Sequence, residues 1–411
     1  MHILWIKTEL LHPVDKGGRI RTYQMLRALK GEHRVTYLTL DDGTAAPDAL
    51  ERASEYADEV VTVPFRPPAK GTAGFYGDLL RNAFSGLPYA VAKYASDALR
   101  RSIEEVCATR DVDVVVCDFL FPSLNVPDGI GVPTVMFQHN VETMIWERHA
   151  NVATNPVKRA YMTEQWRRMR RHEMRECRRF DHVIAVSPQD AEVFKSDFGL
   201  NSVSHVPTGV DVAYFRPTGG YPHGSRDLVF TGSMDWMPNE DSILWFVSEI
   251  LPLVRSRVPD VTLTVVGRNP PGSIRQLAST DSTIRVTGSV PDVRPFIERS
   301  AAFIVPMRVG GGTRLKIFEA MAMERPVVST RIGAEGLPVR DGTDALIADS
   351  PHGFADAIVA LLNDSARAER IGAEAARNVR AHYGWDGVAR RFAELCAGVV
   401  AQQAAAPLVL K

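Results

Sequence analysis

The chain has 411 residues, an ordinary globular composition and a formal net charge of −1 at neutral pH. This length leaves room for two α/β domains, and the balanced charge gives no reason to expect a nucleic-acid partner. The four cysteines are scattered and form no C-x-x-C pair, which argues against a zinc site and favours a reducing compartment. Because the sequence starts directly with an apolar strand and has no long apolar run, we expect neither a secretory signal nor a spanning helix, and we predict a cytoplasmic protein.

The first half of the sequence alternates short apolar strands with helical patterns, which predicts a doubly wound parallel sheet. Gly17 and Gly18 follow the first predicted strand, although the spacing lacks the complete G-x-G-x-x-G pattern of dinucleotide sites. The predicted strands of this half are residues 2–6, 35–40, 60–63, 112–117, 133–137 and 182–186.

His139 comes just after the apolar strand at residues 133–137, with Gln138 between them. Side chains beyond the carboxyl end of a parallel strand lie where α/β sheets place their chemistry, and histidine changes its charge near neutral pH. Two interpretations are open: a histidine that faces a substrate, and a capping or core histidine.

Two other segments of this half allow both a binding and a structural interpretation. Aromatic residues between positions 72 and 95 either line an acceptor groove or form the core of a helical insertion. Residues 158–179 form a long helical pattern rich in arginine. That helix is either a basic amphipathic helix on an anionic membrane surface, which would make the protein peripheral at the inner face of the membrane, or a solvated helix with snorkelling arginine stems.

Closely spaced glycines and prolines between residues 217 and 224 mark a linker to a second α/β half. We place the first domain at residues 1–206 and the second at residues 207–384. The predicted strands of the second domain are residues 228–231, 261–266, 284–287, 301–305 and 326–329, and a final helix is expected at residues 385–400.

The segment 301–337 carries the clearest functional pattern. An apolar strand ends at Pro306 and is followed by three glycines at positions 310–312, where a backbone can approach a ligand closely. Thr313 can cap a helix that continues to about residue 323. The free N–H groups and the positive dipole end at such a helix start suit a phosphate group.

On this predicted helix Gly312, Lys316 and Glu319 share one side. A cation therefore lies one turn into the helix and a carboxylate two turns in, which predicts half of a nucleotide site in an α/β sheet. The alternative is that Lys316 and Glu319 merely pair on the helix surface.

This segment resembles the signature of the family-4 retaining glycosyltransferases, which have the GT-B fold. That signature has a Glu, seven residues, and a second Glu followed by Ala-Met-Ala and a Pro-Val-Val strand. Glu319 and residues 320–322 match its second half, whereas the first Glu would fall at Gly311. The sequence is similar to a subgroup in which GGGTRLK replaces that end, so the usual carboxylate contact to the donor sugar is missing.

The resemblance covers nearly the whole chain and implies two Rossmann-like domains that face a cleft, with the helix at residues 385–400 packing back on the first domain. It implies that a sugar moves from a nucleotide-sugar donor to an unidentified acceptor, which is a polysaccharide, a glycolipid or a small molecule. The anomeric configuration would be retained, because the leaving phosphate accepts the acceptor's proton in a front-face displacement. No metal and no other cofactor is implied.

The resemblance also implies roles for individual residues. His139 would contact the reacting sugar, Lys316 would stabilise the leaving diphosphate, and Glu319 would hold the ribose hydroxyls. The loop at residues 232–239 lacks the Arg and Lys of many family members, so the cations must come from Arg268, Arg308, Arg314 or Lys316. The expected donor-binding residues are Gly17, Gly18, Ser233, Arg268, Val290, Gly311, Gly312, Thr313, Arg314, Lys316 and Glu319.

Three alternatives limit this interpretation. Asp111 and Asp113 match the D-x-D metal motif of another large glycosyltransferase class, but they lie at the start of their strand, whereas ligands gather at the carboxyl ends, and we interpret them as a strand-start charge pair. A nucleotide-sugar 2-epimerase shares the GT-B fold and would turn over its donor without an acceptor. The missing first Glu also allows an inactive nucleotide-sugar-binding protein.

Overall fold

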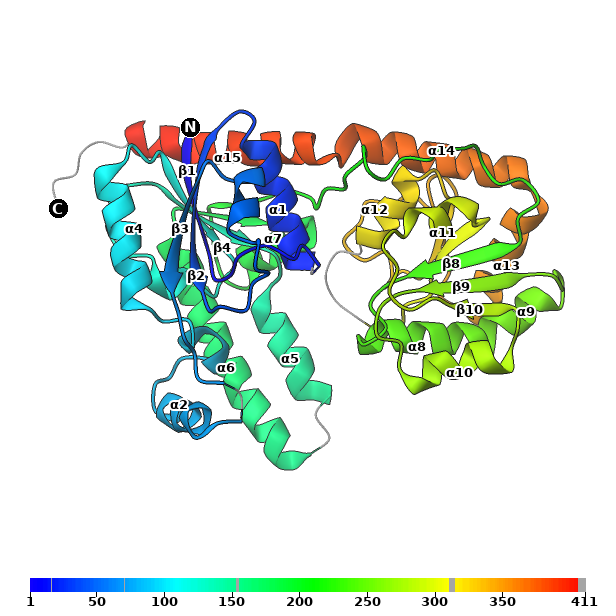
Figure 1. The fold of residues 1–411 in the computed structure, drawn as a ribbon, viewed down its shortest axis with the longest axis horizontal. Coiled ribbons are helices and arrows are strands. Elements are labelled where there is room, and N and C mark those ends of the chain that lie inside the picture. Colours follow the sequence, from blue (N-terminus) through cyan, green and yellow to red (C-terminus); the bar gives the residue numbers. More distant parts are fainter. Residues whose placement is uncertain (16, 70, 153–154, 310–314, 406–411) are drawn as a thin grey trace. The chain divides into compact units, whose positions relative to one another are not determined.

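The computed structural model describes residues 1–15, 17–69, 71–152, 155–309 and 315–405. The chain forms two compact units, one made of Met1–Pro207 with Asp386–Lys411 and the other of Thr208–Trp385. Each unit contains its own sheet with helices packed around it (Figure 1). This confirms the prediction of an α/β protein with two Rossmann-like halves.

The first sheet is formed by β1 (His2–Lys7), β2 (Arg34–Asp41), β3 (Glu59–Pro64), β4 (Val114–Asp118), β5 (Thr134–Gln138), β6 (His182–Ala185) and β7 (Val203–His205). All strands are parallel and their order is β3-β2-β1-β4-β5-β6-β7. The chain reverses its direction of winding between β1 and β4. Their carboxyl ends therefore form the switch point where such sheets bind ligands.

The helices of the first unit are α1 (Gly17–Leu29), α2 (Ala73–Ala83), α3 (Tyr89–Ala92), α4 (Asp97–Thr109), α5 (Glu142–Val152), α6 (Pro156–Arg179), α7 (Pro188–Ser196) and α15 (Trp385–Ala405), with short turns at Glu51–Glu55 and Ser123–Asn125. Polar residues fix several helix starts, as when Ser96 accepts a hydrogen bond from Leu99 N at the start of α4. From Asp386 onward α15 belongs to this unit, and Phe392 packs against Trp5 and Phe137 with ring centroids 5.4 and 5.0 Å apart.

The second sheet is formed by β8 (Asp227–Thr231), β9 (Thr262–Val266), β10 (Ile284–Val286), β11 (Ala302–Val305), β12 (Val327–Ser329) and β13 (Leu346–Ile347). Their order is β10-β9-β8-β11-β12-β13, so the second switch point lies between β8 and β11. The surrounding helices are α8 (Met237–Trp245), a π-helical turn (Phe246–Ile250), α9 (Leu251–Arg255), α10 (Gly272–Thr280), α11 (Arg294–Arg299), α12 (Leu315–Ala322), α13 (Pro351–Asn363) and α14 (Ser365–His382).

Apolar strands buried on both faces produce the cores. Side chains from both faces of the second sheet form two clusters, one around Phe246 and Phe354 and the other around Phe303 and Phe318. In the first unit every residue of β1 is buried, as expected for a central parallel strand. The polar residues that end these strands therefore lie at the rim of a rigid core, which positions the candidate site.

Candidate active site

Asp118 is the centre of a buried polar network at the carboxyl edge of the first sheet. It ends β4, and its side chain is 0% exposed. Its Oδ2 accepts hydrogen bonds from Trp5 Nε1 at 3.0 Å, Lys7 Nζ at 2.9 Å and Thr22 Oγ1 at 2.6 Å. The Lys7–Asp118 ion pair lies at the switch point between β1 and β4, and this set of donors compensates the carboxylate for the loss of water.

His139 lies against the other oxygen of Asp118, with its Nε2 2.7 Å from Oδ1. Its ring is only 2% exposed, and burial lowers the pKa of His139 to about 3 although Asp118 opposes the shift. Burial alone would raise the pKa of Asp118, but Lys7 and His139 outweigh burial and lower it below the usual range. The network therefore pairs one carboxylate with one ammonium and a neutral imidazole at neutral pH.

The contact with Asp118 determines which nitrogen of His139 faces a ligand. We assign the ring proton to Nε2, because a carboxylate can only accept a hydrogen bond. Nδ1 then keeps its lone pair, and it has no hydrogen-bond partner within the part of the chain that the structure describes. It is suited to accept a hydrogen bond from a hydroxyl group.

Phe119 packs over this imidazole. Its φ of 75° lies in the left-handed region, which costs a bulky residue on the order of 1–3 kcal/mol. The Phe119 ring centroid is 4.0 Å from the His139 ring centroid, and Lys7 Nζ lies 4.9 Å from the Phe119 ring centroid. A Cβ on Gly18 would lie 3.4 Å from the Phe119 ring, so Gly18 and Phe119 are in close contact. Gly17 and Gly18 form the first turn of α1.

Two buried carboxyl groups lie at the start of α5, the helix that follows His139 in the chain. Glu173 of α6 accepts hydrogen bonds from the backbone N–H groups of Glu142 at 2.9 Å and Thr143 at 2.8 Å, and so caps the start of α5. Burial, reinforced by Glu173, raises the pKa of Glu142 to about 8, and burial raises the pKa of Glu173 to about 7. Glu142 is therefore mainly protonated at neutral pH.

The second switch point holds Lys316, which lies in the first turn of α12. Its Nζ donates a hydrogen bond to Asn239 Oδ1 at 3.0 Å and lies 4.0 Å from the centroid of the Phe230 ring. Gly232 follows β8, and a Cβ there would lie 2.8 Å from Lys316 Nζ and 2.7 Å from Asn239 Nδ2. Only glycine leaves room for this close approach.

Hydrogen bonds continue from Asn239 to a second cation. Asn239 Nδ2 donates to the carbonyl of Ser233 at 2.8 Å, and Arg268 Nε donates to Ser233 Oγ at 2.8 Å. Ser233 Oγ in turn donates to Asp235 Oδ1 at 2.5 Å. Lys316, Asn239, Ser233 and Arg268 therefore form one polar chain around the loop after β8, which we call the β8 polar chain.

The other expected donor residues have different surroundings. Arg308 is bound by Asp241, with Nη2 2.6 Å from Oδ1. Glu319 is half-buried, and burial raises its pKa to about 7 against the opposing effect of Lys316. Val290 follows β10 and packs half-buried against the core. Gly311, Gly312, Thr313 and Arg314 lie outside the described residues, so their expected phosphate contacts remain predictions.

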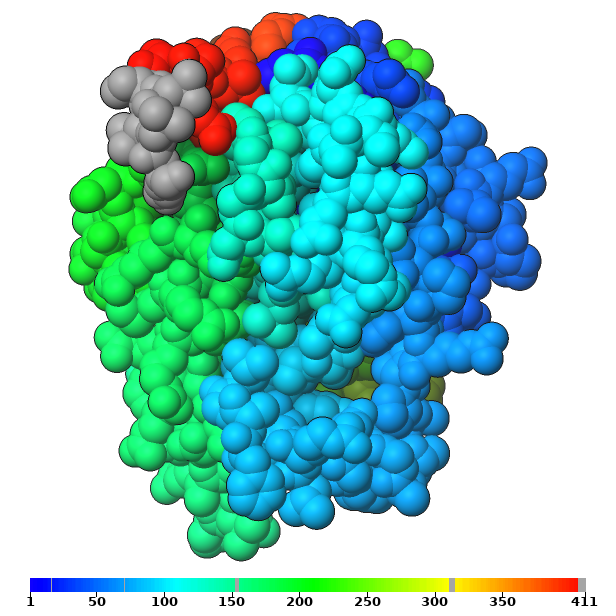
Figure 2. Space-filling view, turned by 90° about the vertical axis from the view of Figure 1, so that its left-hand side faces the viewer, coloured from blue at the N-terminus to red at the C-terminus, as the bar shows by residue number. Residues whose placement is uncertain are grey.

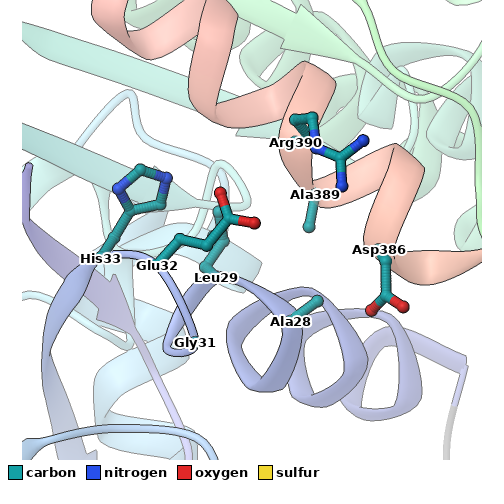
Figure 3. A pocket seen from close by; sticks show the side chains of 8 residues that line it. All are labelled: Ala28, Leu29, Gly31, Glu32, His33, Asp386, Ala389 and Arg390. Carbon is teal, nitrogen blue, oxygen red and sulfur yellow. The ribbon is translucent and has the colours of Figure 1, made fainter.

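Two cavities lie in different units, the first at the amino edge of the first sheet and the second at the carboxyl edge of the second sheet. The first, of about 300 Å³, lies between α1 and the start of α15 and is lined by Glu32, His33 and Arg390 (Figure 3). His33 precedes β2, so this cavity is at the amino edge, away from Asp118. The second, of about 410 Å³, is lined by Met307 and Thr330, which follow β11 and β12 at the carboxyl edge of the second sheet.

The D-x-D pair lies at the amino edge of the first sheet, as predicted. Asp113 precedes β4, and its Oδ2 accepts a hydrogen bond from His2 N at 2.7 Å. Among the residues that the structure describes, no group of three His, Cys, Asp or Glu side chains is arranged to hold a metal ion. Metal independence remains a prediction.

Two family models match the chain one after the other. The model described as Glycosyltransferase Family 4 matches residues 16–214, and the one described as Glycosyl transferases group 1 matches residues 225–364. Together they cover most of the chain. The GGGTRLK subgroup is not distinguished by these matches and remains a resemblance.

The sequence is also similar to curated proteins. A Klebsiella pneumoniae protein, described as an uncharacterized 44.6 kDa protein in the cps region, is 22% identical over 87% of this chain and 90% of its own length. A phosphatidyl-myo-inositol mannosyltransferase of Mycobacterium leprae is 32% identical over 51% of this chain. The match covers 57% of that mannosyltransferase, so the chain spans little more than half of its length.

Solved structures show the same fold at low sequence identity. A sucrose-phosphate synthase from Thermosynechococcus elongatus superposes with a TM-score of 0.70 and 16% identity, covering 98% of this chain and 100% of that one. The Anabaena protein HepE, solved with UDP and glucose, superposes with a TM-score of 0.65 and 13% identity, covering 96% and 99% of the two chains. These likenesses confirm the predicted GT-B architecture of two Rossmann-like domains.

Proposed function

We infer that this chain, which belongs to the glycosyltransferases of family 4 and group 1, transfers a sugar from a nucleotide-sugar donor to an acceptor with retention of anomeric configuration. The observation that carries the proposal is the β8 polar chain at the switch point of the second sheet, because doubly wound sheets bind nucleotides there. HepE, which shares the fold, is solved with UDP, and Mycobacterium tuberculosis relatives are named as GDP-mannose-dependent enzymes. Both names support a nucleotide-sugar donor.

The leaving diphosphate gains charge as the glycosidic bond breaks, and fixed cations stabilise that charge. Lys316 and Arg268 supply the cations in this proposal, since Arg308 is bound by Asp241. Asn239 holds the Lys316 ammonium in place before the donor arrives. Gly232 lets the diphosphate approach both residues, and Glu319 accepts hydrogen bonds from the ribose. No metal or other cofactor takes part.

His139 contacts the donor sugar through Nδ1 and accepts a hydrogen bond from one of its hydroxyls. Asp118 is a positioning residue, because it fixes the tautomer and orientation of the ring by its contact with Nε2. Lys7 and Thr22 hold that carboxylate in turn. Because the imidazole is 2% exposed, the cover formed by Phe119 has to move before a sugar reaches Nδ1.

Retention in this proposal rests on the family resemblance, and the described residues at this edge support a front-face displacement over a double displacement, since they offer no free carboxylate. Asp118 is buried and held by Lys7, Glu173 caps a helix, and burial raises the pKa of Glu142 to about 8. None of the three is placed as the nucleophile of a double displacement. The leaving phosphate therefore accepts the acceptor's proton on the face that it leaves. The acceptor class, whether polysaccharide, glycolipid or small molecule, is not chosen by these observations.

A nucleotide screen tests the donor part of the proposal. Melting curves with UDP, GDP and ADP identify the base, because a ligand at 100 times its dissociation constant adds about 2.7 kcal/mol of stability. The matching nucleotide-sugars are then incubated with and without candidate acceptors in excess chelator. Turnover that requires an acceptor supports transfer, whereas epimerised donor without acceptor supports the 2-epimerase, which none of the comparisons favours.

A further inference from the structure

A row of apolar side chains on α2 points into solvent. Tyr76, Leu80 and Phe84 are 61%, 67% and 87% exposed and follow each other at intervals of four residues. Residues four apart share one side of a helix. Single exposed hydrophobic residues are ordinary on protein surfaces, but a row of large ones marks an interaction site.

The start of α6 carries two further exposed apolar side chains. Val157 and Tyr161 are also four residues apart and are 80% and 44% exposed. The two helices lie together at one end of the first unit (Figures 1 and 2). The Arg168 guanidinium fixes the contact, because its Nη1 and Nη2 donate to the carbonyls of Asn82 and Ala83 at 2.9 and 3.0 Å. We call Tyr76, Leu80, Phe84, Val157 and Tyr161 the apolar tip.

Two arginines at the end of α6 are engaged within the protein. Arg178 donates to the carbonyl of Phe198 at 2.8 Å, and Arg179 donates to the carbonyls of Val126 and Ser123 at 2.7 and 2.6 Å. These two arginines fasten the helix to neighbouring loops. Arg170 and Arg171 remain exposed, so the basic surface expected over residues 158–179 is reduced only at its carboxyl end.

The charge next to the apolar tip is positive. Lys158, Arg159 and Arg167 are exposed in the first half of α6. On α2, Arg81 is balanced by Asp78 at 2.9 Å, and on α6 Glu164 is paired with Arg168. Exposed large apolar side chains beside unbalanced basic ones are the combination that enters the interface of an anionic bilayer.

We propose that the apolar tip, together with Lys158, Arg159 and Arg167, binds the surface of an anionic lipid bilayer. Phe84, Leu80 and Tyr76 enter the headgroup region, where aromatic and long aliphatic side chains are favoured. The basic residues attract anionic headgroups and orient the protein. The attachment is peripheral: in the described ranges of the chain, no helix is both long and apolar enough to cross a membrane.

Vesicle co-sedimentation of the full chain tests this proposal. Vesicles of equal parts phosphatidylglycerol and phosphatidylcholine are compared with pure phosphatidylcholine. We expect binding to the anionic vesicles that weakens with salt, and a partition coefficient about tenfold lower in Leu80→Ser/Phe84→Ser. Lys158→Gln/Arg159→Gln should lower binding to anionic vesicles and reduce its salt dependence. The control is Leu50→Ser, which removes a 55% exposed leucine elsewhere in the first unit and should bind like wild type.

We expect these variants to fold, because each changed side chain is exposed. Melting temperatures equal to that of the wild type verify this. Absence of vesicle binding by the wild type overturns the proposal, as does equal binding by Leu80→Ser/Phe84→Ser. Concentration-dependent dimers that Leu80→Ser/Phe84→Ser abolishes, without vesicle binding, would make the apolar tip a contact between two copies of the chain and would also overturn it.

Discussion

The two carboxylate oxygens of Asp118 have different partners. One oxygen accepts hydrogen bonds from Trp5, Lys7 and Thr22, while the other faces His139. Removing one member of a buried ion pair typically costs about 3–5 kcal/mol, so substitutions of Asp118 would confuse folding with catalysis. His139 is the better residue to vary, since its loss leaves the Lys7–Asp118 pair intact.

His139→Ala should lower kcat about 10- to 100-fold, the effect of losing a hydrogen bond that matters most in the transition state. The affinity for nucleoside diphosphate should stay near wild type, because the nucleotide is held by the second unit. His139→Gln keeps a donor and an acceptor and should retain more activity than Ala. Since the ring is buried, both variants should melt below wild type.

Steady-state kinetics, nucleotide titration and melting curves on the same three proteins separate these effects. An unchanged kcat in His139→Ala would make the residue a bystander. Equal losses of kcat in the Ala and Gln variants, in proportion to the fall in melting temperature, would make its role structural.

Glu142 gives a pH dependence with a defined sign. Its folded-state pKa of about 8 lies above the ordinary value of 4.5, so the folded protein holds a proton that the unfolded chain releases. The contribution of Glu142 to the free energy of unfolding is largest below pH 4.5 and falls as the pH rises toward 8. Glu142→Gln cannot titrate, so it should not lose stability in this way. Its melting temperature should therefore exceed that of the wild type by more at pH 8 than at pH 5.

The control for this measurement is Glu147→Gln, an exposed glutamate on the same helix, which should change the melting temperature little at either pH. A gain in Glu142→Gln that is the same at pH 5 and pH 8 would show that Glu142 is ionised in the folded protein. Glu142 would then be a candidate for a carboxylate nucleophile.

At the level of elements, β8, β9 and α12 bring together the two cations that we propose for nucleotide binding. Arg268 comes from the end of β9 and Lys316 from the first turn of α12, and both connect through Ser233 and Asn239 to the loop after β8. A Cβ on Gly267 would lie 1.7 Å from the carbonyl oxygen of Gly232, so the strand ends pack too closely for any larger residue. The rigid strand ends thus hold the cations in place.

Lys316→Ala should weaken binding of nucleoside diphosphate by about 1.5–3 kcal/mol, which is the range for a charge-assisted hydrogen bond. Isothermal titration with the nucleotide identified by the melting screen measures it. Arg308→Ala is the matched control, because its guanidinium is already bound by Asp241 and should contribute little. The reverse result, a loss with Arg308→Ala alone, would reassign the cation.

The sequence predicted strand positions well, but it predicted only part of the site. His139, Lys316 and Arg268 could be proposed from the sequence because each follows or begins a strongly patterned element. Asp118 was missed because the predicted strand stopped at Cys117, and its partners lie far away in the chain. A polar residue that closes an apolar strand, as Lys7 and Asp118 do, was the available signal.

Pairings across the sheet could not be predicted from local patterns. Arg308 was a candidate cation until the fold placed Asp241 next to it, 67 residues away. The burial of His139 depends on Phe119. The backbone of Phe119 is left-handed, but a phenylalanine gives no sign of this in the sequence, whereas a glycine or asparagine would. The long basic helix was predicted closely and is α6, but which of its arginines remain exposed depended on the loops that they contact.

At the scale of the whole molecule, each unit repeats one arrangement: a parallel sheet whose winding reverses once, with polar residues at the carboxyl ends next to the reversal. The first unit provides Asp118 and His139 there, and the second provides Lys316 and Arg268. The two family-model matches and the repeated geometry both support the proposed nucleotide-sugar chemistry.

A proton NMR time course of the purified chain with its nucleotide-sugar, an acceptor and excess chelator tests this account most directly. The account predicts that nucleoside diphosphate is released and that the first product signal has the same anomeric configuration as the donor. A first product of the opposite configuration would contradict retention. A 2-epimer formed without acceptor, or no turnover although the nucleotide binds, would contradict glycosyl transfer itself.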